Sequence, residues 1–151
     1  MESHAEKAEK LFLDGYNCSQ AVVGAFADEI GIPFTELMKM ASSFGGGMGR
    51  MREVCGTVSG MFMVIGFLYG YDDPKAYEEK SLHYKRIQEL AEKFKAEQGS
   101  IICRELLGLS DEKITHVPEK RSNTYYKKRP CKELVAFAAG LVEEFMKTNQ
   151  Q

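Results

Sequence analysis

The chain has 151 residues, a formal net charge of −2, 44% hydrophobic residues and 28% charged residues. This length and composition predict one globular domain with a buried core and argue against a disordered protein. A net charge this small gives no general attraction to nucleic acid or to anionic lipid, so neither is expected as a partner. Four cysteines are too few for a disulfide scaffold. Because the first residues lack the basic start and apolar run of a signal peptide, we expect a cytoplasmic protein with reduced thiols.

The first third of the chain has apolar residues at the spacing of amphipathic helices. This spacing predicts helices over about residues 4–14, 17–30 and 33–43. Asn17 has a side chain suited to cap the second helix, and Pro33 suits the first turn of the third. We therefore expect three helices joined by tight turns in this part of the chain.

A glycine-rich segment, Phe44–Gly49, follows and is expected to form a loop, because glycine is a poor helix former. The candidates for binding an anionic cofactor in this loop are Gly46, Gly47, Gly49 and Arg50. The Lys-Ser/Thr pair that completes a phosphate-binding loop is missing. The alternative is that the glycines let this backbone pass close to the cysteines.

The segment Val54–Tyr71 is a run of 18 residues without a charge, near the lower limit for a membrane span. Since the run is rich in glycine and the chain has no second one, we predict a central helix over about 54–70, buried on all sides, and no membrane partner. Its glycines fall in two pairs with four-residue spacing, namely Gly56 with Gly60 and Gly66 with Gly70. Small residues at this spacing let helices approach closely, within the fold or between the subunits of a homodimer.

The second half of the chain continues the helical pattern. Apolar spacing predicts a long helix over about 74–97, a short one over about 101–107 and a last one over about 131–147. Residues 109–130 are basic and without a regular pattern, and we interpret them as a solvated loop and not as a nucleic-acid site. The sequence as a whole predicts one all-α domain over residues 1–151, a compact bundle of about six to seven helices.

The cysteines are far apart in the sequence but share a position relative to the predicted helices. They are Cys18, Cys55, Cys103 and Cys131. Each falls in or beside a predicted first turn, where free backbone N–H groups and the helix dipole favour the thiolate. The same donors stabilise the sulfurs of an iron–sulfur cluster. We predict that the sulfurs of Cys18 and Cys55 lie close together, with those of Cys103 and Cys131 near them. The alternative is that each cysteine fills space in the core.

Four ordered motifs carry a family resemblance. They are Asn17-Cys18-Ser19-Gln20-Ala21-Val22, Phe44–Arg50 leading into Glu53–Gly60, Ile102–Gly108 and Arg129-Pro130-Cys131. Together they resemble the redox-active protein family named for its pattern Cys…Gly-Cys-Ala-x-x-Gly…Cys…Cys, over about residues 5–145. The resemblance implies a small helical protein with redox-active cysteines. A related domain lies beside haem in some multi-cofactor cytochromes, which implies iron–sulfur binding as one form of this chemistry.

These observations leave two functions from different classes. The first is a cytoplasmic redox or electron-transfer protein, a thiol-based oxidoreductase if it is an enzyme, acting with an unidentified redox partner. Its four cysteines would be either exchangeable disulfides or ligands of an iron–sulfur cluster or another metal. The second is a non-catalytic helical interaction module, a homodimer whose cysteines are core residues.

Overall fold

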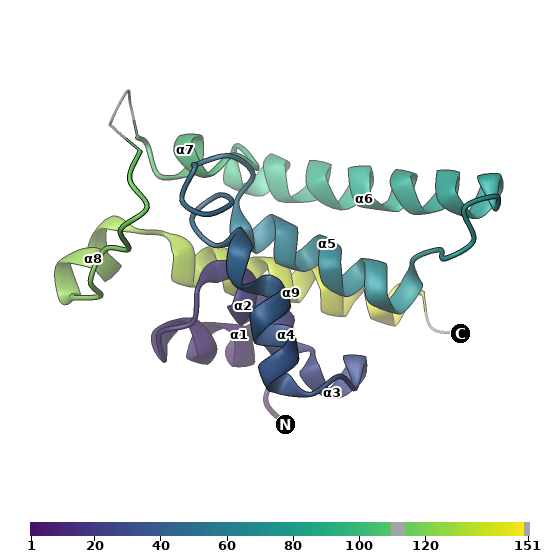
Figure 1. The fold of residues 1–151 in the computed structure, drawn as a ribbon, viewed down its shortest axis with the longest axis horizontal. Helices are drawn as coiled ribbons and strands as arrows, with labels where there is room; N and C mark the ends of the chain where they lie inside the picture. The colour runs from purple at the N-terminus through teal and green to yellow at the C-terminus, as the bar shows by residue number, and fades with distance from the viewer. Residues whose placement is uncertain (110–113, 150–151) are drawn as a thin grey trace.

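The computed structural model describes residues 1–109 and 114–149, and regular structure within them is helical apart from one isolated bridge between Val54 and Ile102 (Figure 1). The helices are α1 (His4–Leu13), α2 (Cys18–Ala25), α3 (Ala27–Ile30), α4 (Phe34–Ala41), α5 (Gly56–Tyr69), α6 (Tyr77–Gln98), α7 (Cys103–Leu106), α8 (Asn123–Lys128) and α9 (Cys131–Thr148), with a 3-10 turn, η1, at Ser42–Phe44. The predicted all-α fold is confirmed.

Two predicted elements are wrong in detail. The helix expected over 17–30 is broken at Phe26, whose φ of −110° and ψ of 17° separate α2 from α3. The Phe26 ring is completely buried and stacks on His4 with the ring centroids 4.2 Å apart. The imidazole of His4 also lies 2.6 Å from a carboxylate oxygen of Glu29 and 2.8 Å from one of Glu143. This tertiary contact, rather than a glycine or proline, marks the break.

The segment expected to be an irregular loop contains helix α8. The Ser122 side chain caps it by accepting a hydrogen bond from the Tyr125 N–H at 3.2 Å. Residues 110–113, which belong to the same predicted loop, lie outside the described residues. The helix matters for the site because Tyr125 lines the same cavity as Phe12 and Cys131, while Tyr126 packs edge-on against the Phe12 ring with the centroids 6.3 Å apart.

The core lies among α1, α2, α5 and α9. The side chains that are less than 2% exposed include Phe12, Phe26, Met61, Ile65, Phe94 and Val135. Helix α5 runs between α6 and α9 in Figure 1. A Cβ on Gly60 would lie 2.9 Å from the Ser19 carbonyl oxygen, so this glycine lets α5 approach the backbone of α2 closely.

Burial of α5 is uneven along its length. Residues 56–61 are buried, whereas Phe67 in the second half is 54% exposed. The expectation of a helix buried on all sides therefore holds only for its first half. Among the described residues, none of the helices is both long enough and apolar enough to cross a membrane.

Candidate functional site

All four cysteines lie at helix starts. Cys18, Cys103 and Cys131 are the first residues of α2, α7 and α9, and Cys55 is the residue that precedes α5. The start of α2 is fixed by a reciprocal cap, in which the Asn17 side chain accepts from the Gln20 N–H at 2.9 Å and the Gln20 side chain accepts from the Asn17 N–H at 3.0 Å. The predicted helix-start positions are confirmed.

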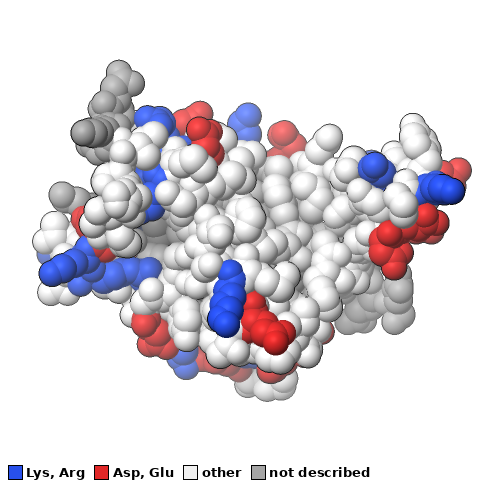
Figure 2. Space-filling view, in the orientation of Figure 1, with Lys and Arg blue, Asp and Glu red and all other residues white. Residues whose placement is uncertain are grey.

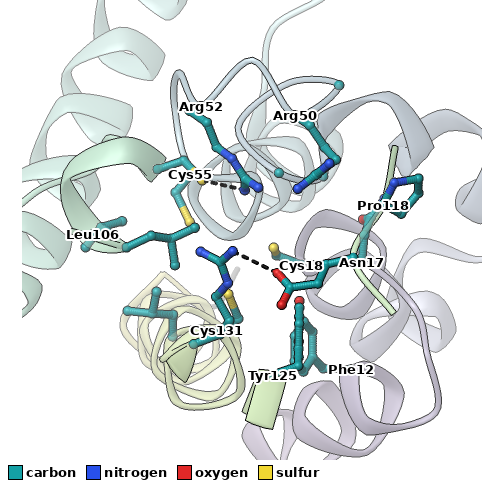
Figure 3. A pocket seen from close by; sticks show the side chains of 18 of the residues that line it. Phe12, Asn17, Cys18, Arg50, Arg52, Cys55, Leu106, Pro118, Tyr125 and Cys131 are labelled. Carbon is teal, nitrogen blue, oxygen red and sulfur yellow. Dashed lines mark hydrogen bonds and ion pairs between the residues drawn. The ribbon is translucent and has the colours of Figure 1, made fainter. Parts of the chain in front are cut away.

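The fold brings these four helix starts to one cavity of about 290 Å³ (Figure 3). Its wall includes all four cysteines, which are free thiols between 4% and 9% exposed. In Figure 3 Cys18, Cys55 and Cys131 come from separate helices toward this space, with Arg50 and Arg52 on one side and Phe12 and Tyr125 on another. Cysteines that are distant in the sequence therefore line one small cavity.

Cys18 and Cys131 form the most closely coupled pair. A hydrogen bond with the Cys131 thiol, aided by the N–H groups of Gly46 and Cys18 and by the Thr57 hydroxyl, outweighs burial and lowers the pKa of Cys18 to about 6. The same hydrogen bond, together with burial and the charge of Cys18, raises the pKa of Cys131. At neutral pH the arrangement is therefore a Cys18 thiolate that accepts a hydrogen bond from a Cys131 thiol.

The other two cysteines remain protonated at neutral pH. Burial and the negative charge of Cys18 raise the pKa of Cys55 to about 12. Burial also raises the pKa of Cys103, an effect opposed by the Arg52 guanidinium, which lies 3.6 Å from the Cys103 sulfur. The cavity is thus lined by one thiolate, that of Cys18, and by the three protonated thiols of Cys55, Cys103 and Cys131.

Cys55 and Cys103 are tied together through the backbone. The Cys55 N–H donates to the Ile101 carbonyl at 2.8 Å, and the Cys103 N–H donates to the Glu53 carbonyl at 2.7 Å. These two bonds flank the isolated bridge between Val54 and Ile102. The start of α7 is therefore held directly against the chain that leads into α5.

The glycine-rich loop passes over the cysteines in an unusual conformation. Every residue from Gly46 to Arg50 has a positive φ, and so does Arg52. A Cβ on Gly47 would lie 2.7 Å from the Cys103 Cβ and 2.7 Å from the Arg52 Cα, so only glycine fits there. Three residues other than glycine, Met48, Arg50 and Arg52, adopt this strained region, which the sequence did not indicate.

Only some of the candidate anion-binding residues of this loop line the cavity. Gly46, Gly49 and Arg50 line the cavity, whereas Gly47 packs behind it against Cys103. The N–H groups of Met48, Gly49 and Arg50 donate to carbonyls of residues 43–45, and the Gly46 N–H faces the Cys18 sulfur. These loop donors are therefore engaged by the protein itself, as the close-approach alternative expects.

Several cavity residues come from the segment that we interpreted as a solvated loop. Arg121 donates to the Tyr16 carbonyl at 2.7 Å and its guanidinium lies 4.0 Å from the centre of the Phe12 ring. Arg129 pairs with Glu119 at 2.9 Å. Sequence reasoning missed these residues, and the only signal for any of them is that Arg129 lies two residues before Cys131.

The donor set does not match a single metal ion in this conformation. Across residues 1–109 and 114–149, no three His, Cys, Asp or Glu side chains are grouped closely enough to hold one. The four thiol groups line a shared cavity but have different neighbours. Cys18 interacts with the Cys131 thiol, whereas the Cys103 sulfur faces the Arg52 guanidinium.

Fold and cavity together define an all-helical protein with a four-cysteine site. The family model described as "Putative redox-active protein (C_GCAxxG_C_C)" matches residues 16–145, a range that includes all four cysteines and most of the chain. The chain belongs to this family. Searches of curated proteins and of solved structures find no match.

Proposed function

We propose that this protein is a cytoplasmic dithiol–disulfide redox protein in which Cys18 and Cys131 cycle between two thiols and one disulfide. The observation that carries the proposal is the hydrogen-bonded pair of Cys18 and Cys131 within the cavity, with the pKa of Cys18 lowered to about 6. A thiolate at neutral pH is the nucleophile of thiol–disulfide exchange, and a neighbouring thiol is the group that resolves the mixed disulfide.

The first step is attack of the Cys18 thiolate on a disulfide substrate. A bond forms between the Cys18 sulfur and one substrate sulfur, the substrate S–S bond breaks, and the other half leaves as a thiolate. The negative charge leaves Cys18 with the departing group. Because that charge is one cause of the raised pKa of Cys131, its loss makes the Cys131 thiol easier to deprotonate.

The second step is attack of Cys131 on the Cys18 sulfur of the mixed disulfide. The Cys131 proton passes to the thiolate released in the first step, the Cys18–Cys131 disulfide forms, and the second half of the substrate leaves as a thiolate. Two electrons have passed from the protein dithiol to the substrate disulfide. Cys55 and Cys103, whose pKa values are raised, remain thiols throughout.

A count of thiols and metal in protein purified without oxygen tests the proposal. We expect four titratable thiols in the reduced protein, no stoichiometric iron, and loss of two thiols on mild oxidation. Mass spectrometric peptide mapping should then find the disulfide between Cys18 and Cys131. A matched variant, Cys103→Ser, should still form this disulfide, whereas Cys131→Ser should not.

Two outcomes would overturn the proposal. Stoichiometric iron and sulfide with visible absorbance would assign the four thiols to an iron–sulfur cluster. Four thiols that resist both oxidation and alkylation in the folded protein would support a non-catalytic interaction module with core cysteines.

A further inference from the structure

The cavity that holds the cysteines carries an excess of positive charge. Its wall includes Arg50, Arg52, Arg121 and Arg129, while Glu119 is the sole carboxylate among its described lining residues. Glu119 pairs with Arg129 at 2.9 Å, so one carboxylate faces four guanidinium groups. Figure 2 shows Lys and Arg side chains gathered at the same end of the molecule, where α8 lies.

Most of these guanidinium groups have partners that carry no charge. Arg50 donates to the carbonyls of Thr115 and Val117, and Arg121 donates to those of Phe12, Gly15 and Tyr16. Carbonyl oxygens satisfy the N–H donors but leave the positive charge uncompensated. The Nε of Arg129 is buried and has no hydrogen-bond partner in the described part of the chain, so the pairing with Glu119 does not satisfy this guanidinium fully.

The shape of the site selects small molecules over protein disulfides. The cysteines are at most 9% exposed and lie on the wall of a cavity of about 290 Å³. A disulfide on the surface of a folded protein cannot reach a sulfur in such a position without rearrangement. A small disulfide enters directly, and a wall of guanidinium groups raises the local concentration of its anions.

We propose that the substrate of this site is a low-molecular-weight disulfide that bears carboxylates. The inference rests on the proposed function, since it names the compound that the Cys18–Cys131 pair reduces. The chemistry is the exchange already described, in which one substrate disulfide becomes two small thiols as the protein dithiol becomes a disulfide. The arginines bind the carboxylates and take no part in the exchange of sulfur.

The test compares three probe disulfides of different charge on the reduced protein. The probes are 5,5′-dithiobis(2-nitrobenzoate), which is anionic, 4,4′-dithiodipyridine, which is neutral, and cystamine, which is cationic. Each rate constant is divided by that of the same probe with 2-mercaptoethanol, so that differences in intrinsic reactivity cancel. We expect the normalised rate of the anionic probe to exceed that of the neutral probe on the order of ten-fold at low salt, and the ratio to fall as salt is added.

Charge variants assign the effect to the cavity. Arg129→Gln and, as a second variant, Arg50→Gln should each lower the ratio of anionic to neutral rates several-fold. Because a changed thiol pKa affects both probes alike, the ratio reports substrate binding alone. Lys85→Gln is the matched control, since Lys85 is exposed on α6 and does not line the cavity, and its ratio should equal that of the wild type.

The outcomes separate this inference from the proposed function. If all three probes produce the Cys18–Cys131 disulfide at equal normalised rates, the substrate class is wrong and the redox pair stands. If none of the three probes produces that disulfide, the proposed function itself fails. A ratio that Lys85→Gln lowers as much as Arg129→Gln does would assign the preference to the net charge of the protein and would also overturn the inference.

Discussion

Cys131, at the start of the last helix, lines the same cavity as Cys18, at the start of the second, and is the largest cause of the lowered pKa of Cys18. The two helices contact each other, and both pack on α5, so the pair sits where three helices meet. The interaction of the two thiols shifts both pKa values in opposite directions, lowering that of Cys18 and raising that of Cys131.

The alkylation of Cys18 should depend on pH with a midpoint near 6. The thiolate is the reactive form, and the pKa of Cys18 is lowered to about 6. The rate therefore rises with pH through this value and levels off above it, and at pH 5 it should be about ten-fold below the plateau. Iodoacetamide labelling followed by peptide mass spectrometry measures the rate at this residue. A midpoint near 9 would show that Cys18 is an ordinary thiol.

Cys131→Ala should make Cys18 less reactive at neutral pH. The variant removes the hydrogen-bond donor that is the largest cause of the lowered pKa and leaves the effect of burial in place. Loss of a hydrogen bond to a charged group corresponds to about one to two pKa units, so alkylation at pH 7 should slow by about two- to ten-fold. Cys103→Ala is the matched control and should leave the Cys18 rate unchanged, since Cys103 is not among the causes of the shift. Equal slowing in both variants would argue for a general loss of structure.

Thr57→Val should raise the pKa of Cys18 without destabilising the fold. The Thr57 side chain is completely buried, and its hydroxyl acts to lower the pKa values of both Cys18 and Cys55. Valine keeps the shape and removes the hydroxyl, so alkylation at pH 6 should slow several-fold while the free energy of unfolding stays the same or rises by about 1 kcal/mol.

Two further variants decide whether the Thr57 effect belongs to its hydroxyl. Thr57→Ser restores a hydroxyl and should recover most of the Cys18 rate. Ser19→Ala removes another buried hydroxyl that has no partner in the described chain, but Ser19 does not act on Cys18. The alkylation rate of Cys18 in the Ser19→Ala variant should match that of the wild type. Slower alkylation in this variant would count against a specific role for Thr57.

Gly47→Ala should destabilise the protein by about 2–4 kcal/mol. Gly47 has a φ of +74°, and an added Cβ would lie 2.7 Å from the backbone of Arg52 and from the Cys103 Cβ. Urea unfolding followed by circular dichroism measures the change. Gly140→Ala in α9 is the matched control, because nothing lies within 4 Å of its added Cβ, and it should stabilise the helix by about 0.5–1 kcal/mol. Equal effects in both variants would contradict the close approach of the loop to Cys103.

The sequence predicts those parts of the site that depend on local signals. The cap at Asn17 and the proline before Cys131 mark helix starts, and these starts place the sulfurs at the ends of helices. The glycines between 45 and 49 likewise indicate a loop that can approach another group closely. Each of these signals lies within a few residues of the feature that it predicts.

The remaining features depend on contacts between distant residues. Phe26 ends α2 because its ring packs on His4, and Arg121 reaches the cavity because its guanidinium bonds carbonyls at the end of α1. Met48, Arg50 and Arg52 also adopt the left-handed conformation, although none of these three residues is a glycine that would favour it. A periodic pattern carries no information about such long-range partners. For this reason the pattern of residues 109–130 does not show that part of this basic segment lines the cavity.

The backbone bonds between the chain around Cys55 and that around Cys103 have a mechanical consequence. They tie the starts of α5 and α7 together through the backbone, and these two starts carry Cys55 and Cys103. Cys18 and Cys131 are the first residues of two other helices, α2 and α9. Because the start of α7 cannot leave the start of α5 without breaking these backbone bonds, we expect Cys55 and Cys103 to keep their relative position whatever happens at the other two sulfurs.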